Sequence, residues 1–461
     1  MKKNNTSRYQ IDMLNGPLFG KILLFALPLM LSSILQLLFN AADVVVVGRY
    51  SGKEALAAVG STTALINLIL NLFMGLSVGT NVLLAKELGA GRREEARQGM
   101  HTAITFALLG GIILSVIGIC FSRTFLTWMS SPTDVIDLSA LYLKIYFCGV
   151  PGNLVYNFGA AALRSQGDTR RPLYYLTAAG IINVVLNLFF VRRCGMSVDG
   201  VALATIISQY ISAILVVRCL RKDADGLHLD WHLLRLDRES VKKILKVGFP
   251  SGLQGMMFSL SNVVIQSSLN SFDSTVLVAA SSAAANIEGF GFACVNVFSQ
   301  TALTFISQNV GACQKERVLK IRRHCILCSV AMGLLFGGIT LLFGHGLVSI
   351  YAPGEEEVIA CAIDRLRFIG TPYFLSALMD VQVGILRGLG YSIYPMVCTL
   401  VAVCGLRLLW VAVVFPCHRT PENLYLSYPV SWLVAAICLL LFYYLVRRKA
   451  LARITPDKIF S

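Results

Sequence analysis

The sequence predicts an all-α polytopic membrane protein with twelve transmembrane helices in two pseudo-symmetric six-helix lobes. Three observations lead to this fold class. The 461 residues are 56% hydrophobic and only 14% charged, whereas a soluble protein carries about 25% charged residues. Apolar runs of about 20 residues, which is the length needed to cross a bilayer, recur along the chain. The first half of the chain also matches the second half.

The internal match aligns residues 21–91 with residues 243–313 at a constant offset of 222 residues. Pro28, for example, falls on Pro250. Transporters are commonly built from paired halves. The match therefore predicts two lobes of the same fold.

The repeat continues beyond this stretch. Residues 149–151 (Gly-Val-Pro) match residues 370–372 (Gly-Thr-Pro), and the Arg-x-x-Gly stretch at 164–167 matches the one at 387–390. Each half is therefore expected to place a short Arg-Gly turn after its fourth helix. A proline follows near the start of the fifth helix, where its missing N–H costs nothing.

The twelve expected spans follow from the apolar runs. They cover residues 22–47, 55–82, 102–121, 138–158, 173–191, 200–218, 244–270, 276–306, 325–345, 361–384, 395–415 and 428–446.

Lys and Arg residues set the expected orientation of these spans. With the N-terminus inside, the inner segments carry thirty of them and the outer segments six. Cytoplasmic loops carry such an excess. We expect a multi-pass protein of the bacterial inner membrane with both termini in the cytoplasm. The basic residues form short clusters between apolar runs, so the net charge of +15 does not indicate nucleic-acid binding.

The longest polar segment lies between the two halves of the repeat. It predicts an N-terminal lobe over residues 1–220, a cytoplasmic linker over residues 221–243 and a C-terminal lobe over residues 244–461. Residues 231–245 of this region are compatible with an amphipathic helix on the membrane surface.

Several stretches, taken in order, resemble the multidrug and toxic compound extrusion (MATE) transporters in their DinF/NorM-type bacterial branch. The stretches that carry the resemblance are FALPLMLSSILQLLFNAADVVVVGR, LAKELGAGRREEA, LRSQGDTRRP, INVVLNLFF, GVALATIISQ and ILRGLGYSIYPM.

The resemblance implies two six-helix lobes around a central cavity. It also implies a secondary active antiporter that exports amphipathic, often cationic compounds in exchange for H⁺ or Na⁺ by alternating access. No cofactor other than the coupling ion is expected. The expected partners are a small-molecule substrate and the lipid bilayer, and the expected state is a monomer. The alternatives are a flippase or exporter of lipid-linked or metabolite substrates and, less in keeping with the residues, a membrane enzyme.

Asp43 is the first candidate for ion coupling. An acid inside a span is costly and indicates a function, and the family has its coupling acid at this position of the motif. The internal repeat aligns Asp43 with Ile265, so the two lobes are not expected to share the ion-coupling acid. The alternative is that Asp43 faces water at the outer end of its span.

Asn183 and Asn187 lie four residues apart and share one helix face. The family often has an acid at the second position. Here Asn187 stands there, so a relay of two acids is not expected. Asp43, Asn183, Asn187 and Thr205 would instead offer oxygen ligands to one Na⁺, or Asp43 would act alone as a proton site. The alternative is that the two Asn side chains only bridge helices.

The remaining candidates are intramembrane polar, aromatic and Met residues expected to line the substrate cavity, with helix packing as the alternative for most of them. Met side chains would give the cavity a pliable apolar wall, and Arg407 is a candidate charge partner for Asp380. The cavity candidates are Asn67, Asn71, Tyr142, Tyr146, Met256, Met257, Phe258, Asp380 and Gln382.

Patterns typical of enzymes are better explained by packing. The GLSVG stretch of residues 75–79 matches a nucleophile elbow but follows no strand. Gly75 and Gly79 are instead expected to allow close helix contact. The six His residues show no metal-ligand spacing.

Overall fold

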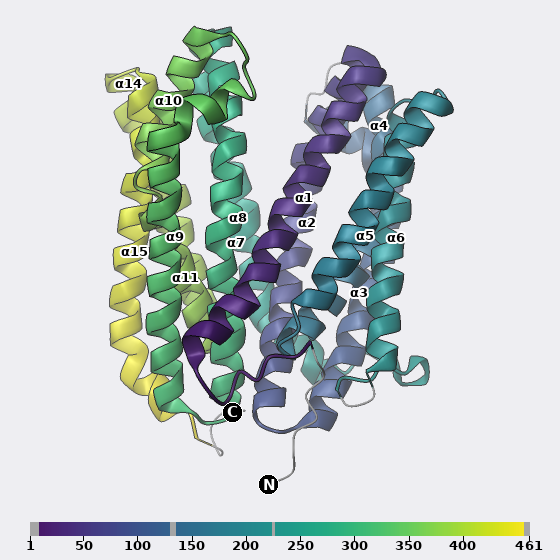
Figure 1. Ribbon diagram of the computed structural model, residues 1–461, viewed down its shortest axis with the longest axis vertical. Coiled ribbons are helices and arrows are strands. Elements are labelled where there is room, and N and C mark those ends of the chain that lie inside the picture. The colour runs from purple at the N-terminus through teal and green to yellow at the C-terminus, as the bar shows by residue number, and fades with distance from the viewer. Residues whose placement is uncertain (1–8, 130–134, 224–225, 456–461) are drawn as a thin grey trace. The chain divides into compact units, whose positions relative to one another are not determined.

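The computed structural model describes residues 9–129, 135–223 and 226–455, and all regular structure among them is helical. The first half of the chain forms α1 (Leu18–Tyr50), α2 (Gly52–Gly89), α3 (Arg93–Trp128), α4 (Ile136–Ser165), α5 (Arg170–Leu188) with the π-helical turn η1 (Phe189–Arg193), and α6 (Val198–Lys222) (Figure 1).

The second half begins after a short 3₁₀ turn, η2 (Trp231–Leu233). It forms α7 (Arg238–Asn270), α8 (Thr275–Gly311), α9 (Lys315–Ser349), α10 (Glu356–Gly370), α11 (Tyr373–Gly388), α12 (Ile393–Thr399), η3 (Leu400–Gly405), α13 (Leu406–Leu409), η4 (Trp410–Val414), α14 (Phe415–Cys417) and α15 (Pro421–Ala452).

Eleven of the twelve expected spans fall within one continuous helical segment, and the twelfth, residues 361–384, is divided between α10 and α11. Among the described residues, ten helices are long and apolar enough to cross a membrane, and the bent pair α10–α11 would make an eleventh span. The 33 residues of α7 are enough to cross by length, although α7 is not one of the ten. The chain is a multi-pass membrane protein, as predicted.

The repeated Gly-x-Pro motif gives different backbones in the two halves. Pro151 lies inside the continuous helix α4. At the matching Pro372 the helix is interrupted, and α10 and α11 meet at an angle of 45°. Proline removes one helical hydrogen bond and crowds the preceding turn, so both a continuous and a broken helix are compatible with the motif. The packing around the proline decides between them.

Contacts divide the chain into two compact units. Unit 1 comprises Met1–Asn15 and Leu27–Gly252, and unit 2 comprises Gly16–Ala26 and Leu253–Ser461. The boundaries lie inside α1 and α7, so each of these helices contributes to both units. The division expected from the sequence, at residues 220 and 244, stays a prediction.

The core of unit 1 depends on close helix contacts at glycines. A Cβ atom on Gly75 of α2 would lie 2.0 Å from the backbone nitrogen of Gly252 on α7, and one on Gly79 would lie 2.2 Å from the carbonyl oxygen of Ile244. Such approaches are possible only without a side chain. The packing role expected for these two glycines is therefore confirmed.

The described part of the polar connection between α6 and α7 belongs to unit 1 and packs against α3 and α6. The backbone N–H of Leu229 donates to the carbonyl of Leu220 over 3.1 Å, and that of Asp230 donates to Nε2 of His101 over 3.0 Å. The amphipathic helix expected over residues 231–245 forms only in part: residues 231–233 make the turn η2, and residues 238–245 are the first turns of α7, which begins at Arg238. Its place on the membrane surface stays a prediction.

In unit 2, a buried cluster joins the N-terminal part of α8 to α9 and α10. It includes Ala280, Ala284, Val348, Ala362 and Leu366. This packing sets α10 beside α8, where their charged side chains meet.

Candidate functional site

Asp43 lies on α1 in unit 1 and is joined to α5 by a hydrogen bond. Nδ2 of Asn187 donates to Oδ1 of Asp43 over 2.5 Å. The same Nδ2 donates to Oδ1 of Asn183 over 3.2 Å. Asp43 is half-buried, whereas Asn187 is fully buried. The carboxylate is therefore held by a donor that is itself covered by the protein.

The chain of hydrogen bonds continues to α6. Nδ2 of Asn183 donates to Oγ1 of Thr205 over 3.4 Å, and this hydroxyl donates to the carbonyl of Val201 over 2.9 Å. The structure thus brings together all four residues expected to couple to the ion, from three helices. Their role in coupling stays a prediction.

One acceptor in this group has no partner. Oδ1 of Asn187 is buried and accepts no hydrogen bond from the described residues. Burying a polar atom without a partner is costly. The oxygen lies on the amide group that binds Asp43, so a rotation of that amide would present it to the carboxyl group.

Two tyrosines of α4 lie near the acid. The rings of Tyr142 and Tyr146 are stacked with their centroids 6.0 Å apart and an interplanar angle of 28°. Both interact electrostatically with Asp43, and the hydroxyl of Tyr146 is hydrogen-bonded to the side chain of Gln209. The structure therefore adds Gln209 to the surroundings of Asp43. The sequence alone did not single it out.

The two Asn residues of α2 that are cavity candidates differ in exposure. Asn67 is exposed and Asn71 is half-buried. Their place in a substrate cavity stays a prediction.

A second polar group lies in unit 2, around Asp380 of α11. Nδ2 of Asn296 on α8 donates to Oδ2 of Asp380 over 2.9 Å, and Nε2 of Gln300 donates to Oδ1 of Asn296 over 2.8 Å. The basic residue that interacts electrostatically with Asp380 is Arg387. The expected partner, Arg407, is engaged elsewhere.

The other cavity candidates of unit 2 lie close to helix interfaces. Gln382 is fully buried, and neither its Oε1 nor its Nε2 has a hydrogen-bond partner among the described residues. Met256, Met257 and Phe258 are half-buried on α7. The backbone carbonyl of Met257 accepts a hydrogen bond from the thiol of Cys404 over 3.4 Å.

An ion pair that the sequence did not reveal joins α8 to α10. Nε and Nη2 of Arg365 donate to the two carboxylate oxygens of Glu288 over 2.8 and 2.9 Å. Only 6% of the Arg365 side chain and 13% of the Glu288 side chain are exposed. Two parallel bonds of this kind give a strong and directional interaction.

Arg407 forms a separate set of contacts in the same unit. It donates from Nε to Oγ of Ser431 over 3.1 Å and from Nη1 to Oδ1 of Asn262 over 3.2 Å. Its guanidinium group also lies 4.0 Å from the ring centroid of Tyr428. With Arg365, unit 2 holds two buried guanidinium groups near one carboxylate. Glu288 is an acid within the expected span 276–306. This acid was the sequence signal that could have revealed the cluster of Glu288, Arg365 and Arg407.

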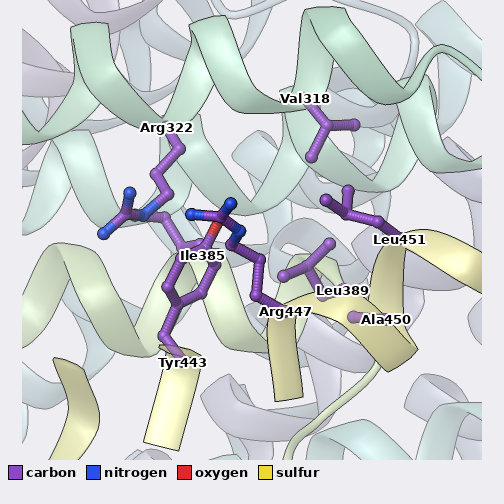
Figure 2. Close-up of a pocket in the computed structure, with 8 residues that line it drawn as sticks. All are labelled: Val318, Arg322, Ile385, Leu389, Tyr443, Arg447, Ala450 and Leu451. Carbon is purple, nitrogen blue, oxygen red and sulfur yellow. The ribbon is translucent and has the colours of Figure 1, made fainter. Parts of the chain in front are cut away.

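A hollow at the ends of α9, α11 and α15 is not a ligand site. Figure 2 shows Tyr443 with Arg322 and Arg447 beside it. The guanidinium carbon of Arg322 lies 3.9 Å from the Tyr443 ring centroid, and the hollow is too narrow for a water molecule.

A family model described as MatE matches residues 28–189 and 250–413. The chain belongs to the MatE family. The two matched segments begin at Pro28 and Pro250, which the internal repeat aligns. The family expected from the sequence is therefore confirmed, and the MatE model covers both halves of the repeat.

Named relatives of this MatE chain are similar over most of their lengths. "Probable multidrug resistance protein YoeA" of Bacillus subtilis is 27% identical over 437 residues, which is 92% of this chain and 93% of the relative. "Probable multidrug resistance protein NorM" of Thermotoga maritima is 28% identical over 399 residues, or 84% of each chain. The "FAD transporter" of Shewanella oneidensis is 26% identical over 364 residues, covering 75% of this chain and 76% of the relative.

Solved structures share the fold of this MatE chain. The crystal structure of MATE in complex with MaL6 matches with a TM-score of 0.90 at 21% identity and covers 97% of this chain and 100% of that one. A MOP superfamily transporter from Pyrococcus furiosus, described as having a binding pocket of reverse polarity, matches with a TM-score of 0.89 at 22% identity, covering 97% and 99%. These matches confirm the MATE-type fold.

Proposed function

We propose that this MatE protein is a secondary active antiporter. It exports amphipathic, often cationic compounds in exchange for H⁺ or Na⁺ by alternating access, and it catalyses no chemical step. Family membership and the names of the relatives support export. The observation that carries the coupling mechanism is the chain of hydrogen bonds from Asp43 through Asn187 and Asn183 to Thr205.

Protonation of Asp43 would change this chain of bonds. The ionised carboxylate accepts a hydrogen bond from Asn187, whereas a protonated carboxyl group has a proton to donate. The unpartnered Oδ1 of Asn187 is the acceptor that such a proton needs once the amide rotates. The contact between α1 and α5 then depends on the proton, which gives the two conformations different affinities for it.

Binding of Na⁺ would use the oxygens of the same group. Oδ1 of Asn183 already accepts a bond from Asn187, and Nδ2 of Asn187 faces Asp43. Na⁺ binding and protonation of Asp43 both require the Asn187 amide to turn its oxygen toward the carboxyl group. The vesicle assay below therefore decides between the two coupling ions.

The substrate would compete with the ion through charge and aromatic contacts. A cationic compound beside Asp43 would be attracted to the faces of the stacked Tyr142 and Tyr146 rings. Within unit 2, Met256 and Met257 would offer a flexible apolar surface to substrates of different shapes. A site that holds the ion or the substrate, but not both, couples their movements.

Transport in reconstituted vesicles tests this proposal. Export of a fluorescent cation is measured with a pH gradient or a Na⁺ gradient imposed separately. Transport driven by the pH gradient alone supports Asp43 as a proton site, and transport that requires Na⁺ supports the oxygen cage.

The Asp43→Asn variant should fold normally and lose coupled transport. The matched control is Asp364→Asn, because Asp364 is an exposed acid at a helix surface. Full coupled transport by Asp43→Asn would contradict the proposal.

A second candidate function is export of an anionic metabolite or a lipid-linked substrate. The buried Arg365 and Arg407 near the single acid Glu288 favour negative charge in unit 2. One relative is named an FAD transporter. Movement of a flavin nucleotide, but of no cationic dye, in the same vesicles would favour this candidate.

We infer a location in the bacterial cytoplasmic membrane, with both termini in the cytoplasm and the protein as a monomer. The distribution of Lys and Arg supports this orientation. Protease digestion of a C-terminal tag in right-side-out vesicles tests it, because a cytoplasmic tag stays protected. Light scattering of the purified protein measures its oligomeric state.

A further inference from the structure

Unit 1 has a groove that takes no part in the proposed export of a solute. It lies over α4 between α3 and α6, reaches η2 at one end and has a volume of about 650 Å³. Its apolar lining includes Leu108, Pro151, Val155, Ile214 and Val217. It is large enough for part of a lipid or another elongated apolar molecule.

Small residues of α4 create the groove. A Cβ atom on Gly152 would lie 3.1 Å from the Tyr210 ring of α6, and one on Gly111 of α3 would lie 2.6 Å from Cα of Pro151. The flanking helices α3 and α6 therefore approach α4 closely, and their larger side chains form the two sides of the groove. The floor is recessed because the residues at these contacts are small.

One end of the groove carries only positive charge. Arg218, Arg221 and Lys222 line it in the last two turns of α6, and all three are exposed. No acidic residue lines the groove, and none of these three forms an ion pair with a residue in the described part of the chain. Three cations with no ion-pair partner among the described residues can attract the negative charge of a phosphate group.

Trp231 is held beside these cations. The guanidinium carbon of Arg221 lies 5.9 Å from its ring centroid, and the hydrogen bond from Asp230 to His101 fixes the adjoining backbone. Tryptophan is enriched at the interface between membrane and water. Its position marks the cationic end as the headgroup level.

The length of the groove fits one leaflet. Its lining on α6 runs from Tyr210 to Lys222, which is about 18 Å at the rise of an α-helix. Half of a hydrocarbon core of about 30 Å is about 15 Å. At the far end, the Tyr210 hydroxyl donates to the carbonyl of Cys148 over 2.8 Å, so it places no unpaired polar group in the apolar part.

We propose that this groove binds an anionic phospholipid of the leaflet that meets the linker between α6 and α7. The phosphate lies at Arg218, Arg221 and Lys222, and one acyl chain lies on the floor formed by α4. Basic pockets between transmembrane helices are known to recognise lipid headgroups in this way. The cationic end of the groove fits a phosphate headgroup, and the apolar floor fits an acyl chain. The occupant is therefore a lipid rather than an exported solute.

Quenching of Trp231 fluorescence tests the proposal on the full-length protein. The probe is phosphatidylglycerol with brominated acyl chains, titrated into protein in phosphatidylcholine nanodiscs. The difference between wild type and Trp231→Phe isolates the signal of Trp231. We expect saturable quenching by phosphatidylglycerol. Equal quenching by brominated phosphatidylcholine would overturn the proposal, and so would competition by inorganic phosphate as effective as competition by lipid.

Two variants separate the headgroup contact from the apolar contact. Arg218→Gln/Arg221→Gln/Lys222→Gln should weaken phosphatidylglycerol binding roughly a hundredfold, since each cation near an anionic surface contributes to affinity. Val217→Phe narrows the groove, keeps all three cations, adds no tryptophan to the fluorescence signal and should also weaken binding. Unchanged binding by either variant would overturn the proposal.

The matched control removes the same charge elsewhere. Arg448, Lys449 and Arg453 are exposed at the end of α15, outside the groove. Their triple substitution by Gln should leave the quenching of Trp231 unchanged. A loss equal to that of the groove variant would show that net charge, rather than the groove, attracts the lipid, and would overturn the proposal.

Discussion

Asn187 holds the carboxylate of Asp43 through a 2.5 Å hydrogen bond between α5 and α1. The resemblance to the family implies an acid at this position, and the chain has an amide there. An amide supplies a donor and an acceptor without adding charge. One side chain therefore serves the ionised form of Asp43 through Nδ2 and the protonated form through Oδ1.

Asn187→Leu should lower coupled transport at least tenfold. The substitution removes the donor to Asp43, and a hydrogen bond to a charged group contributes about 1.5–3 kcal/mol. The measurement is efflux of a fluorescent cation under a pH gradient. The control is Asn286→Leu, because Asn286 is exposed on α8 and donates only to a backbone carbonyl. Equal rates for the two variants would exclude a role for Asn187.

Glu288→Gln should destabilise unit 2 by about 3–5 kcal/mol, since it leaves the buried Arg365 without its counterion. Asp364→Asn on α10, the helix that carries Arg365, is the control, because the Asp364–Arg367 pair is exposed. An exposed pair contributes about 0–1 kcal/mol. Unfolding in detergent is followed by circular dichroism. Removing both charges with Glu288→Gln/Arg365→Gln should recover part of the loss, and a double variant less stable than the single one would contradict this account.

Gly79→Ala should lower the melting temperature, whereas Gly60→Ala should not. Both glycines lie on α2. A Cβ on Gly79 meets the backbone of α7 at 2.2 Å, while one on Gly60 has no atom within 4 Å. The overpacking caused by Gly79→Ala typically costs about 1–3 kcal/mol of stability. At the open position of Gly60, alanine favours the helix over glycine by roughly 0.5–1 kcal/mol. Equal melting temperatures would show that α2 and α7 adjust without cost.

Gly167→Ala should destabilise the protein more than Gly390→Ala, although the internal repeat aligns the two positions. Both glycines have positive φ, at 88° and 93°, so each substitution strains the backbone. At Gly167 the added Cβ would also lie 2.4 Å from the carbonyl oxygen of Ile11, whereas at Gly390 it would meet nothing within 4 Å. The melting temperatures of the two variants measure this difference, and a larger loss at Gly390 would contradict it.

The sequence determined the fold and the family because these depend on local and repeated features. Apolar runs, the offset between the two halves and the excess of Lys and Arg on one side are all properties of the chain as written. Asp43 was also visible, since an acid inside an apolar run is costly wherever its helix packs.

The tertiary structure decided which side chains meet. Asp380 and Arg407 each looked like a partner for the other, but the orientation of the helices gives Asp380 to Asn296 and Arg407 to Asn262. Glu288 and Arg365 lie 77 residues apart, and nothing local pairs them. Contacts between helices depend on their rotation, tilt and spacing, which small residues such as Gly75 set through packing across the whole unit. A linear pattern shows that a helix crosses the membrane, whereas only packing shows which of its faces meets which neighbour.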